Sequence, residues 1–591
     1  MTGVLAGALP VVPLVVALLG LLLPLTARRV AAGLGIGGAF LALAAAVALA
    51  IGLRGTRTGG WTFVDVGGLV VRAGYRVDVR AAFVALAVTG VALAVQVYSV
   101  AYLHDDDRYP PYAAQVSLFT AAMLLVVVAD DLILLLIGWE VMGVCSYLLI
   151  GHDRKLPEAP AAAVKAFLVT RVGDVGFLLG IALLAAQTGS FDLGRVNAAA
   201  SHGGVTVAAL LLLAGVAGKS AQFPLHTWLP DAMAGPTPIS ALIHAATMVA
   251  AGVYVVTRLY PVFTAAPAAL AVLGIMAAIT MLLGALAATA QADIKRVLAW
   301  STVSQVAYMS GALAVGAPVT ALFHLLTHAA FKALLFLAAG AVIHAVGSNL
   351  MDRMGGLRRG MPVTFVTMTI GLAALAGLPP MSGFFSKDQV LAAAWEAAVH
   401  GGPAPRWVAV LVLAAGLATV VITGWYATRL WLRTFFGPTP STVDPHEPPL
   451  LMRWPLLILA VPAAGLGFAH LAAVDWTTVA ALVCVAAGIA GAWRQWRRGT
   501  DLAPALLADA FHLDAVQHAV VVRPVLALAA LVRTGDESLV DGGVEATGRG
   551  AYGLGGIVAR WHRGALPRAA TAVLGGAVLI GLAAVLVVGL R

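Results

Sequence analysis

Ionisable side chains occur inside long apolar stretches of this sequence, where groups that exchange protons are seldom kept without a role. A charge at the centre of a bilayer costs about 2.5–3.5 kcal/mol on insertion scales, so each one needs a partner or a function. Carboxylates, lysines and histidines gain or lose protons when burial or a nearby charge changes. The candidates for such chemistry are Glu140, Lys165, Arg171, Asp174, Lys219, His244, His324, His328, Lys332, Lys387 and Asp388.

Glu140 and Lys219 are predicted to form the first functional pair. Glu140 lies between apolar stretches, so we expect it away from any surface. A buried carboxylate either finds a cation or takes up a proton, and a lysine on a neighbouring helix is its natural partner. Pro224 and Pro230 interrupt the helix just after Lys219. Helix breaks at membrane depth mark ion sites in transporters, whereas a purely structural ion pair is the alternative for Glu140.

The apolar stretch that follows Glu140 holds three further charges. Arg171 and Asp174 are three residues apart and share one face of a helix, and Lys165 precedes them. We expect the Arg171–Asp174 pair to tune the charge of Glu140 and Lys219. Structural pairing carries equal weight as an alternative.

A stripe of three ionisable residues predicts a proton relay. His324, His328 and Lys332 occupy positions i, i+4 and i+8. On a helix each step is about 6 Å along the axis, a gap that one water can bridge. A single buried histidine would more often be a core residue, but three groups on one stripe favour a relay. His244 follows the first break by one helix and could link the two halves.

A second proline break predicts an internal repeat. Pro379 and Pro380 precede Lys387 and Asp388 within a long apolar stretch, as Lys219 and Pro224 stand together earlier. We expect two copies of one five-helix unit, residues 111–260 and 261–437. Five is an odd number, so the second copy must enter the membrane inverted relative to the first.

Composition requires a membrane as the solvent of this chain. Hydrophobic residues make up 61% and charged residues 11% of 591 residues, and the mean hydropathy is +0.95; soluble domains carry about 25% charged residues. Sixteen stretches are long enough to cross about 30 Å of hydrocarbon. They are 3–26, 30–53, 81–103, 112–130, 132–151, 161–186, 205–225, 237–259, 267–290, 297–315, 318–346, 362–388, 406–436, 452–471, 474–493 and 569–589.

The predicted fold is an all-α polytopic membrane protein of about sixteen transmembrane helices. Within it, we expect two inverted five-helix repeats with broken helices and an amphipathic lateral helix. Beyond the two repeats, the expected segments are N-terminal helices with an external hairpin loop (1–110), additional transmembrane helices (438–501), the lateral helix (502–565) and a C-terminal transmembrane helix (566–591).

Two segments outside the spans have readable patterns. Between Arg54 and Arg80, apolar and polar residues alternate on either side of Gly67-Gly68, which predicts an external β-hairpin. From about Leu502 to Ala551 apolar residues recur at near-helical spacing beside a polar side, which predicts a helix along the membrane surface. An irregular loop is the alternative for the second segment.

Basic residues set the expected orientation. The loops after odd-numbered spans carry basic residues, at Arg28-Arg29, Arg154-Lys155, Lys295-Arg296, Arg353, Arg358-Arg359 and Arg494 to Arg498. By the positive-inside rule these loops are cytoplasmic and the N-terminus is outside. The loop from Arg54 to Arg80 carries five arginines and opposes this orientation. The first span lacks a basic leader and is expected to be retained. The net charge of +9 is scattered rather than gathered on one face, which argues against nucleic-acid binding.

The sequence predicts no cofactor and no metal site in this chain. Cys145 and Cys484 both lie in apolar spans, which excludes iron–sulfur clusters, structural zinc and a disulfide framework. Phosphate loops, dinucleotide fingerprints and nucleophile elbows are not found. Energy must therefore come from an ion gradient or from partner subunits.

Five strings of the sequence resemble the L subunits of bacterial respiratory complex I, the NADH-quinone oxidoreductase. They are Gly138-Trp-Glu-Val-Met-Gly-Val-Cys-Ser-Tyr-Leu-Leu-Ile-Gly, Thr170-Arg-Val-Gly-Asp, Gly218-Lys-Ser-Ala-Gln, Asp231-Ala-Met-Ala-Gly-Pro-Thr-Pro-Ile-Ser-Ala-Leu-Ile-His and Asp293-Ile-Lys-Arg-Val-Leu-Ala. The amphipathic segment with a final span, and a lysine rather than a glutamate at position 387, favour L over the M or N type.

The resemblance implies roles for the candidate residues. Glu140 and Lys219 would be the coupled pair of the first half-channel, Lys332 the central lysine with His324 and His328 beside it, and Lys387 the exit lysine flanked by Asp388. Implied partners are the lipid membrane and other complex I membrane subunits, with M- and N-type subunits along the lateral helix. The implied location is the plasma membrane of a bacterium.

The expected mechanism depends on separation of charges. While Glu140 is close, Lys219 stays protonated; once the pair separates, burial favours release of the proton toward Lys332, and Lys387 passes it outward. Three alternatives share the fold: a subunit of a Mrp-type cation/proton antiporter, a subunit of a membrane-bound hydrogenase or inorganic-carbon uptake complex, and a scaffold that moves no ions. A Mrp A subunit would have a much longer C-terminal part.

Overall fold

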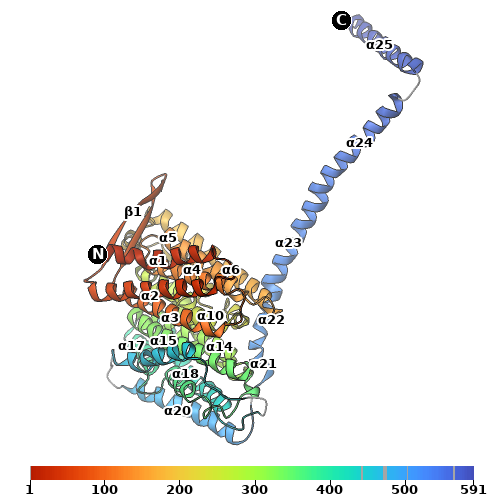
Figure 1. The fold of residues 1–591 in the computed structure, drawn as a ribbon. Helices are drawn as coiled ribbons and strands as arrows, with labels where there is room; N and C mark the ends of the chain where they lie inside the picture. Colours follow the sequence, from red (N-terminus) through yellow and green to blue (C-terminus); the bar gives the residue numbers. More distant parts are fainter. Residues whose placement is uncertain (1, 441–443, 470–474, 502, 563–565, 591) are drawn as a thin grey trace. The chain divides into compact units, whose positions relative to one another are not determined.

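The computed structural model of the chain describes two compact units, Met1–Phe511 and His512–Arg591. Residues 1, 441–443, 470–474, 502, 563–565 and 591 lie outside the described part. Helices dominate both units (Figure 1). The prediction of an all-α polytopic membrane protein is therefore confirmed.

The elements of the first unit follow one another as α1 (Thr2–Leu21), α2 (Arg28–Gly52), β1 (Arg57–Val66), β2 (Leu69–Val77), α3 (Val79–Tyr102), α4 (Tyr109–Val128), α5 (Leu132–Ile150), α6 (Glu158–Thr188), α7 (Leu193–Ala199), α8 (Thr206–Lys219), α9 (Trp228–Asp231), α10 (Thr237–Ala245), α11 (Met248–Arg258), α12 (Tyr260–Thr264), α13 (Pro267–Ala290), α14 (Ile294–Ala314), α15 (Pro318–Val346), α16 (Pro362–Ala376), α17 (Ser382–His400), α18 (Arg406–Phe435), α19 (Leu450–Gly465), α20 (Trp476–Arg497) and α21 (Ala505–Ala508). Short 3-10 helices are η1 (Ala200–His202), η2 (Ala232–Ala234), η3 (Met351–Arg353), η4 (Leu466–Ala469) and η5 (Ala510–His512).

In its described residues, the second unit consists of helical segments. They are α22 (Leu513–Gln517), α23 (Arg523–Gly535), α24 (Gly542–His562) and α25 (Leu566–Gly589), with π-helical turns η6 (His518–Val522) and η7 (Asp536–Asp541) between the first three. The amphipathic segment is thus helical rather than an irregular loop. Within this unit the helical segments follow one another from Leu513 to His562, about 75 Å at 1.5 Å per residue.

Within the described residues, fourteen helices are long and apolar enough to cross a membrane. All sixteen predicted spans overlap helices, but three of them, at α8, α14 and α16–α17, are not among the fourteen; α8 and α16 are shorter apolar helices. The fourteen also include the stretch Ala510–His562, which was predicted to lie along the membrane surface. The predicted span 362–388 is two helices, because α16 ends at Ala376 and α17 begins at Ser382 and runs to His400. The proline break expected there is present, whereas the second helix extends beyond the predicted limit.

One helix break was not predicted. The span 237–259 is divided into α10 and α11 at Ala246–Thr247. Thr247 has φ −118° and ψ −106°, outside the helical region, and its hydroxyl donates to the Leu242 carbonyl oxygen at 2.5 Å. A threonine hydroxyl can compete for helical carbonyls in this way, and hydropathy gives no sign of it.

The helix order repeats once in the first unit. The first copy comprises α4, α5, α6, α8 and the α10–α11 span, and the second comprises α13, α14, α15, the α16–α17 span and α18. In both copies the first two helices pack together, and the third packs on the fourth. Each copy has a helix break in its fourth span, after Lys219 and after Ala376. An odd number of spans per copy inverts the second copy relative to the first.

The predicted hairpin is formed by β1 and β2, which pair antiparallel and turn at Gly67 and Gly68. Both glycines have positive φ, the conformation that such a turn requires. Arg76 of β2 donates to Asp130 at 2.5 Å, and the Arg72 backbone N–H donates to Asp131 at 3.0 Å. Asp131 also caps α5 through Ile133 N–H. The hairpin, which projects beside α1 (Figure 1), is thereby attached to the helix that carries Glu140.

Glycines allow α18 and α20 to pack in close contact. A Cβ added at Gly488 would clash with the Val421 carbonyl oxygen, and one at Gly424 would lie 2.8 Å from the Val485 carbonyl oxygen. Small residues of this kind let helix backbones approach in membranes. The resulting α18–α20 pair fixes one wall of the second repeat.

Gly488→Ala is expected to force α18 and α20 apart and lower the thermal unfolding midpoint. The added methyl meets backbone, which cannot move aside cheaply, and overpacking costs about 1–3 kcal/mol. Scanning fluorimetry of the purified protein in detergent measures the midpoint. Gly465→Ala in α19 is the matched control, because no atom lies within 4 Å of its added Cβ. Equal midpoints for the two variants would contradict the packing described.

Candidate functional site

Four charged residues form a connected group across α5, α6 and α8. Lys219 Nζ lies 3.1 Å from Asp174 Oδ2, and the two side chains are 0% and 3% exposed. Arg171 lies 4.0 Å from the same carboxylate oxygen and contacts Glu140 on its other side. The connected order is therefore Glu140, Arg171, Asp174 and Lys219.

The predicted direct pairing of Glu140 with Lys219 is corrected by this geometry. In the described part of the chain, the recorded ion pair of Lys219 is with Asp174, and that of Glu140 is with Arg171. The Glu140 side chain is also 30% exposed rather than buried. It lies on the same helix face as Ile137 and Val144, which are 49% and 42% exposed. Apolar neighbours in sequence did not distinguish an outward face from an inward one.

Small residues bring Asp174 and Lys219 together. A Cβ at Gly173 would lie 2.5 Å from the Ala214 carbonyl oxygen and 3.2 Å from Gly218 Cα, so α6 and α8 are in close contact at these glycines. Lys219 is the last residue of α8, where the carbonyl end of the helix dipole favours a cation. A Cβ at Gly143 would lie 2.6 Å from Lys219 Nζ, so the missing side chain provides the space for the ammonium group.

Trp139 holds the Asp174 carboxylate from the α5 side. Its indole Nε1–H donates to Asp174 Oδ1 at 2.6 Å, and its ring stacks on Phe177 with centroids 4.3 Å apart. Lys219 Nζ is 5.7 Å from the centroid of the same ring. Trp139 adjoins Glu140 in sequence but was not singled out, because a tryptophan in an apolar stretch usually indicates packing.

The central stripe lies on one helix as predicted. His324, His328 and Lys332 are all on α15 and at most 1% exposed, and the two imidazole centroids are 6.3 Å apart. Lys332 Nζ donates to the Leu298 carbonyl oxygen at 3.0 Å and to the Ser301 hydroxyl of α14. The acceptors of Lys332 are thus uncharged, whereas the acceptor of Lys219 is the carboxylate of Asp174.

The unexpected break between α10 and α11 lies against this stripe. His328 hydrogen-bonds the backbone of Ala245, the last residue of α10. A break at membrane depth frees backbone groups that protein or water must satisfy, and His328 satisfies one here. His244 is 0% exposed, its ring centroid is 4.7 Å from that of Phe336, and it lies within electrostatic range of Lys332.

The second predicted break connects to the stripe through Ser386. The Ser386 hydroxyl hydrogen-bonds His324 Nδ1 at 2.9 Å and Thr327 Oγ1 at 2.8 Å. Lys387, 3% exposed, donates to the Leu375 carbonyl oxygen near the end of α16. Asp388 accepts a hydrogen bond from Thr478 Oγ1 of α20 at 3.0 Å. His324, Lys387 and Asp388 thus all lie beside the break between α16 and α17.

Two lysines fall outside the expected grouping. Lys165 pairs with Asp231 at 2.5 Å rather than with Glu140 or Asp174, and Arg296 lies 3.3 Å from the same Asp231. Lys295 was counted among loop charges, yet it is 6% exposed and donates to the carbonyl oxygens of Met233 and Gly235 at 2.5 and 2.7 Å. One feature of the sequence could have indicated that Lys295 is buried: it follows Asp293, the N-cap of α14, by two residues.

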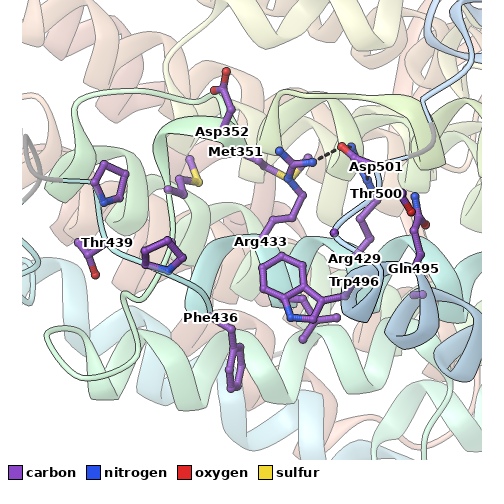
Figure 2. Close-up of a pocket in the computed structure, with 17 residues that line it drawn as sticks. Met351, Asp352, Arg429, Arg433, Phe436, Thr439, Gln495, Trp496, Thr500 and Asp501 are labelled. Carbon is purple, nitrogen blue, oxygen red and sulfur yellow. Dashed lines mark hydrogen bonds and ion pairs between the residues drawn. The ribbon is translucent and has the colours of Figure 1, made fainter.

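A pocket of about 590 Å³ between α18, α20 and η3 includes none of these residues. Figure 2 shows Arg429, Arg433 and Asp501 gathered at one side of it. Arg429 donates to both Asp501 carboxylate oxygens, at 2.7 and 2.8 Å. Burial raises the pKa of Asp501, but the hydrogen bonds and charges of Arg429 and Arg433 outweigh it and hold that pKa below its ordinary value. Asp501 offsets one of the two guanidinium charges, and the cluster ties the residues after α20 to α18.

Comparisons with known proteins identify the family. The transmembrane model of the NADH:quinone oxidoreductase and Mrp antiporter family matches residues 129–418, and the N-terminal model of complex I chain 5 matches residues 61–113. NADH-quinone oxidoreductase subunit L from Mycobacterium tuberculosis (strain H37Rv) is 40% identical over 573 residues, covering 90% of this chain and 89% of that protein. The chain belongs to the subunit L family of NADH-quinone oxidoreductases. The resemblance seen in the sequence is thereby confirmed.

Other relatives agree with this placement. NAD(P)H-quinone oxidoreductase chain 5 from Picosynechococcus sp. is 44% identical over 439 residues, covering 67% of this chain and 64% of that protein. The Mrp complex from Dietzia sp. DQ12-45-1b contains a chain with a TM-score of 0.70 and 29% identity, over 100% of this chain and 63% of that one. A chain of an archaeal membrane-bound sulfane sulfur reductase has a TM-score of 0.67 and 24% identity, over 77% and 74%, and shows the fold alone.

A double-mutant cycle should show that Lys219 is coupled to Asp174 rather than to Glu140. Asp174→Asn leaves a buried lysine unpaired, which typically costs 3–5 kcal/mol, and adding Lys219→Met should recover part of that loss. Glu140→Gln and Lys219→Met, which are linked only through Arg171 and Asp174, should show a smaller coupling than Asp174→Asn and Lys219→Met. The measurement is the unfolding midpoint of the purified protein for each single and double variant. A larger coupling for Glu140 would restore the pairing expected from the sequence.

Proposed function

We propose that this chain is a proton-translocating membrane subunit of an NADH-quinone oxidoreductase. The observation that carries the proposal is the row of buried ionisable groups that begins at Asp174–Lys219, continues through Lys332 and the two histidines of α15, and ends at Lys387. The row passes both predicted helix breaks, where carbonyl groups are released from helical bonding. Family membership supplies the reaction that would drive it.

The proposed coupling runs through Arg171. Its guanidinium lies between Glu140 and Asp174, so any movement of Glu140 changes how strongly Arg171 competes with Lys219 for the Asp174 carboxylate. When Asp174 turns toward Arg171, the buried Lys219 loses its counter-charge and burial favours release of its proton. Glu140, 30% exposed on an outward face, is placed to sense a neighbouring subunit.

The proposed transfer continues along a series of buried groups, of which His324 and Ser386 are in direct contact. The proton passes by way of His244 to Lys332, then through His328 and His324 to Ser386 and Lys387, with Asp388 at the exit. Lys332 and Lys387 have carbonyl or hydroxyl acceptors, which can bind either protonation state of the amine through a donated hydrogen bond. Water is expected to bridge the longer steps.

The partners and orientation are part of the same proposal. We infer that M- and N-type subunits contact the helical segments of the second unit, because α23 and α24 contain no residue that is buried within that unit. From the basic loops we infer that the N-terminus lies outside a bacterial plasma membrane.

Lys219→Ala is expected to abolish NADH-driven proton translocation while the complex still assembles. Inverted membrane vesicles measure proton uptake, with quinone reduction followed in parallel and assembly checked on a native gel. Lys155→Ala, in an exposed loop, is the matched control. Full translocation by an assembled Lys219→Ala complex would refute the proposal.

The likeness to the Mrp complex favours a second candidate, a cation/proton antiporter subunit. It predicts that a Na⁺ gradient moves protons in the same vesicles without NADH. The chain is 40% identical to a subunit L and 29% identical to this Mrp chain, which favours the first candidate. Proton movement driven by Na⁺ and not by NADH would decide for the antiporter.

A further inference from the structure

A groove of about 1110 Å³ lies between α20 and the turn after α16, away from the row of lysines. On α20 it is lined by Leu482, Val485, Ile489 and Trp493, which recur at helical spacing along one face. Opposite them stand Leu378 and Pro379, in the break between α16 and α17. The apolar wall is therefore continuous from the break to the end of α20.

A smaller apolar pocket of about 260 Å³ extends this groove toward α18. The two share Leu378, Ile489 and Trp493, and the smaller one adds Leu372 and Trp431. From Leu482 to Arg497 α20 rises about 22 Å, more than half of a hydrocarbon core of about 30 Å. The groove has the length and the lining to hold a lipid acyl chain.

Three arginines form one end of the groove. Arg494, Arg497 and Arg498 belong to its lining, and within the described residues none of them has a carboxylate partner. Arg429 and Arg433 nearby share the Asp501 carboxylate, so the contrast is local. The Arg497 guanidinium lies 6.0 Å from the Trp493 ring centroid.

The geometry points to a binding site for one anionic phospholipid, with an acyl chain along the apolar wall and its phosphate at Arg494, Arg497 and Arg498. Charge complementarity selects the headgroup, because clustered arginines beside a transmembrane helix attract anionic lipid at about 1 kcal/mol each. Trp493 stands where aromatic side chains mark the membrane interface. The far end of the acyl chain would pack against Leu378 and Pro379. These two residues lie in the segment between Leu375, whose carbonyl oxygen accepts a hydrogen bond from Lys387, and Lys387 itself.

The test uses the whole purified complex in nanodiscs that contain photoreactive phosphatidylglycerol or photoreactive phosphatidylcholine. Crosslinked peptides are located by mass spectrometry. We expect phosphatidylglycerol to crosslink to the α20 face of the groove, and Arg494→Gln, Arg497→Gln and Arg498→Gln together to lower its apparent affinity about a hundredfold, at about fivefold for each arginine. The corresponding triple lysine variant keeps the positive charge and should retain binding.

A second variant tests the acyl groove without touching the charges. Ala486→Phe fills the groove, whereas Ala487→Phe adds the same side chain at an exposed position outside its lining. Loss of at least tenfold in crosslinking with the first and none with the second is expected. Equal labelling by the two lipids would overturn the proposal and indicate non-specific annular lipid. Crosslinks only to another protein segment, or equal effects of the two phenylalanine variants, would overturn it as well.

Discussion

An ammonium group inside a membrane must have an acceptor, and the rest of this structure is arranged around that constraint. Four of the six lysines of the chain are buried. Lys219 has a carboxylate, Asp174, while Lys295, Lys332 and Lys387 have carbonyl or hydroxyl acceptors. Several of these carbonyls belong to helix ends or helix breaks. The breaks leave backbone carbonyl groups without helical partners, and these carbonyls accept hydrogen bonds from the buried lysines.

The difference between the acceptors gives the row a direction. A carboxylate stabilises the charged lysine far more than a carbonyl does, because the bond is charge-assisted. Lys219 thus has a fixed counter-charge, whereas the acceptors of Lys332 and Lys387 are uncharged. Arg171 contacts both Asp174 and the outward-facing Glu140. The proposed function uses this asymmetry: it assigns control to the Asp174–Lys219 end and proton exchange to the remaining lysines.

The hairpin and the glycines serve this arrangement from a distance. Asp131 receives the hairpin backbone at Arg72 and caps α5, so the helix that carries Glu140 and Trp139 begins at a fixed point. Gly173 and Gly218 then set the separation of α6 and α8, and Gly143 leaves room for the ammonium group. Larger side chains at these positions would displace Lys219 from Asp174, since interiors are close-packed.

Spans, both proline breaks, the hairpin and the histidine stripe could be predicted from the sequence, because hydropathy, proline and turn glycines act locally along the chain. The candidate residues were found for the same reason: a charge in an apolar stretch is visible without a structure. What the sequence could not give was which side of a helix each charge faces. Glu140 was expected inside and lies on an outward face, and Lys295 was taken for a loop charge and is buried.

Partner choice was decided by tertiary structure alone. Asp174 rather than Glu140 reaches Lys219 because α6 and α8 approach at Gly173 and Gly218, and the break at Thr247 matters because α15 brings His328 to Ala245. Sequence determined which residues can exchange protons and that a membrane surrounds them. Only the packing of helices distant in sequence determined which of them meet, because contacts of a few ångströms depend on helix rotation and separation that local patterns do not encode.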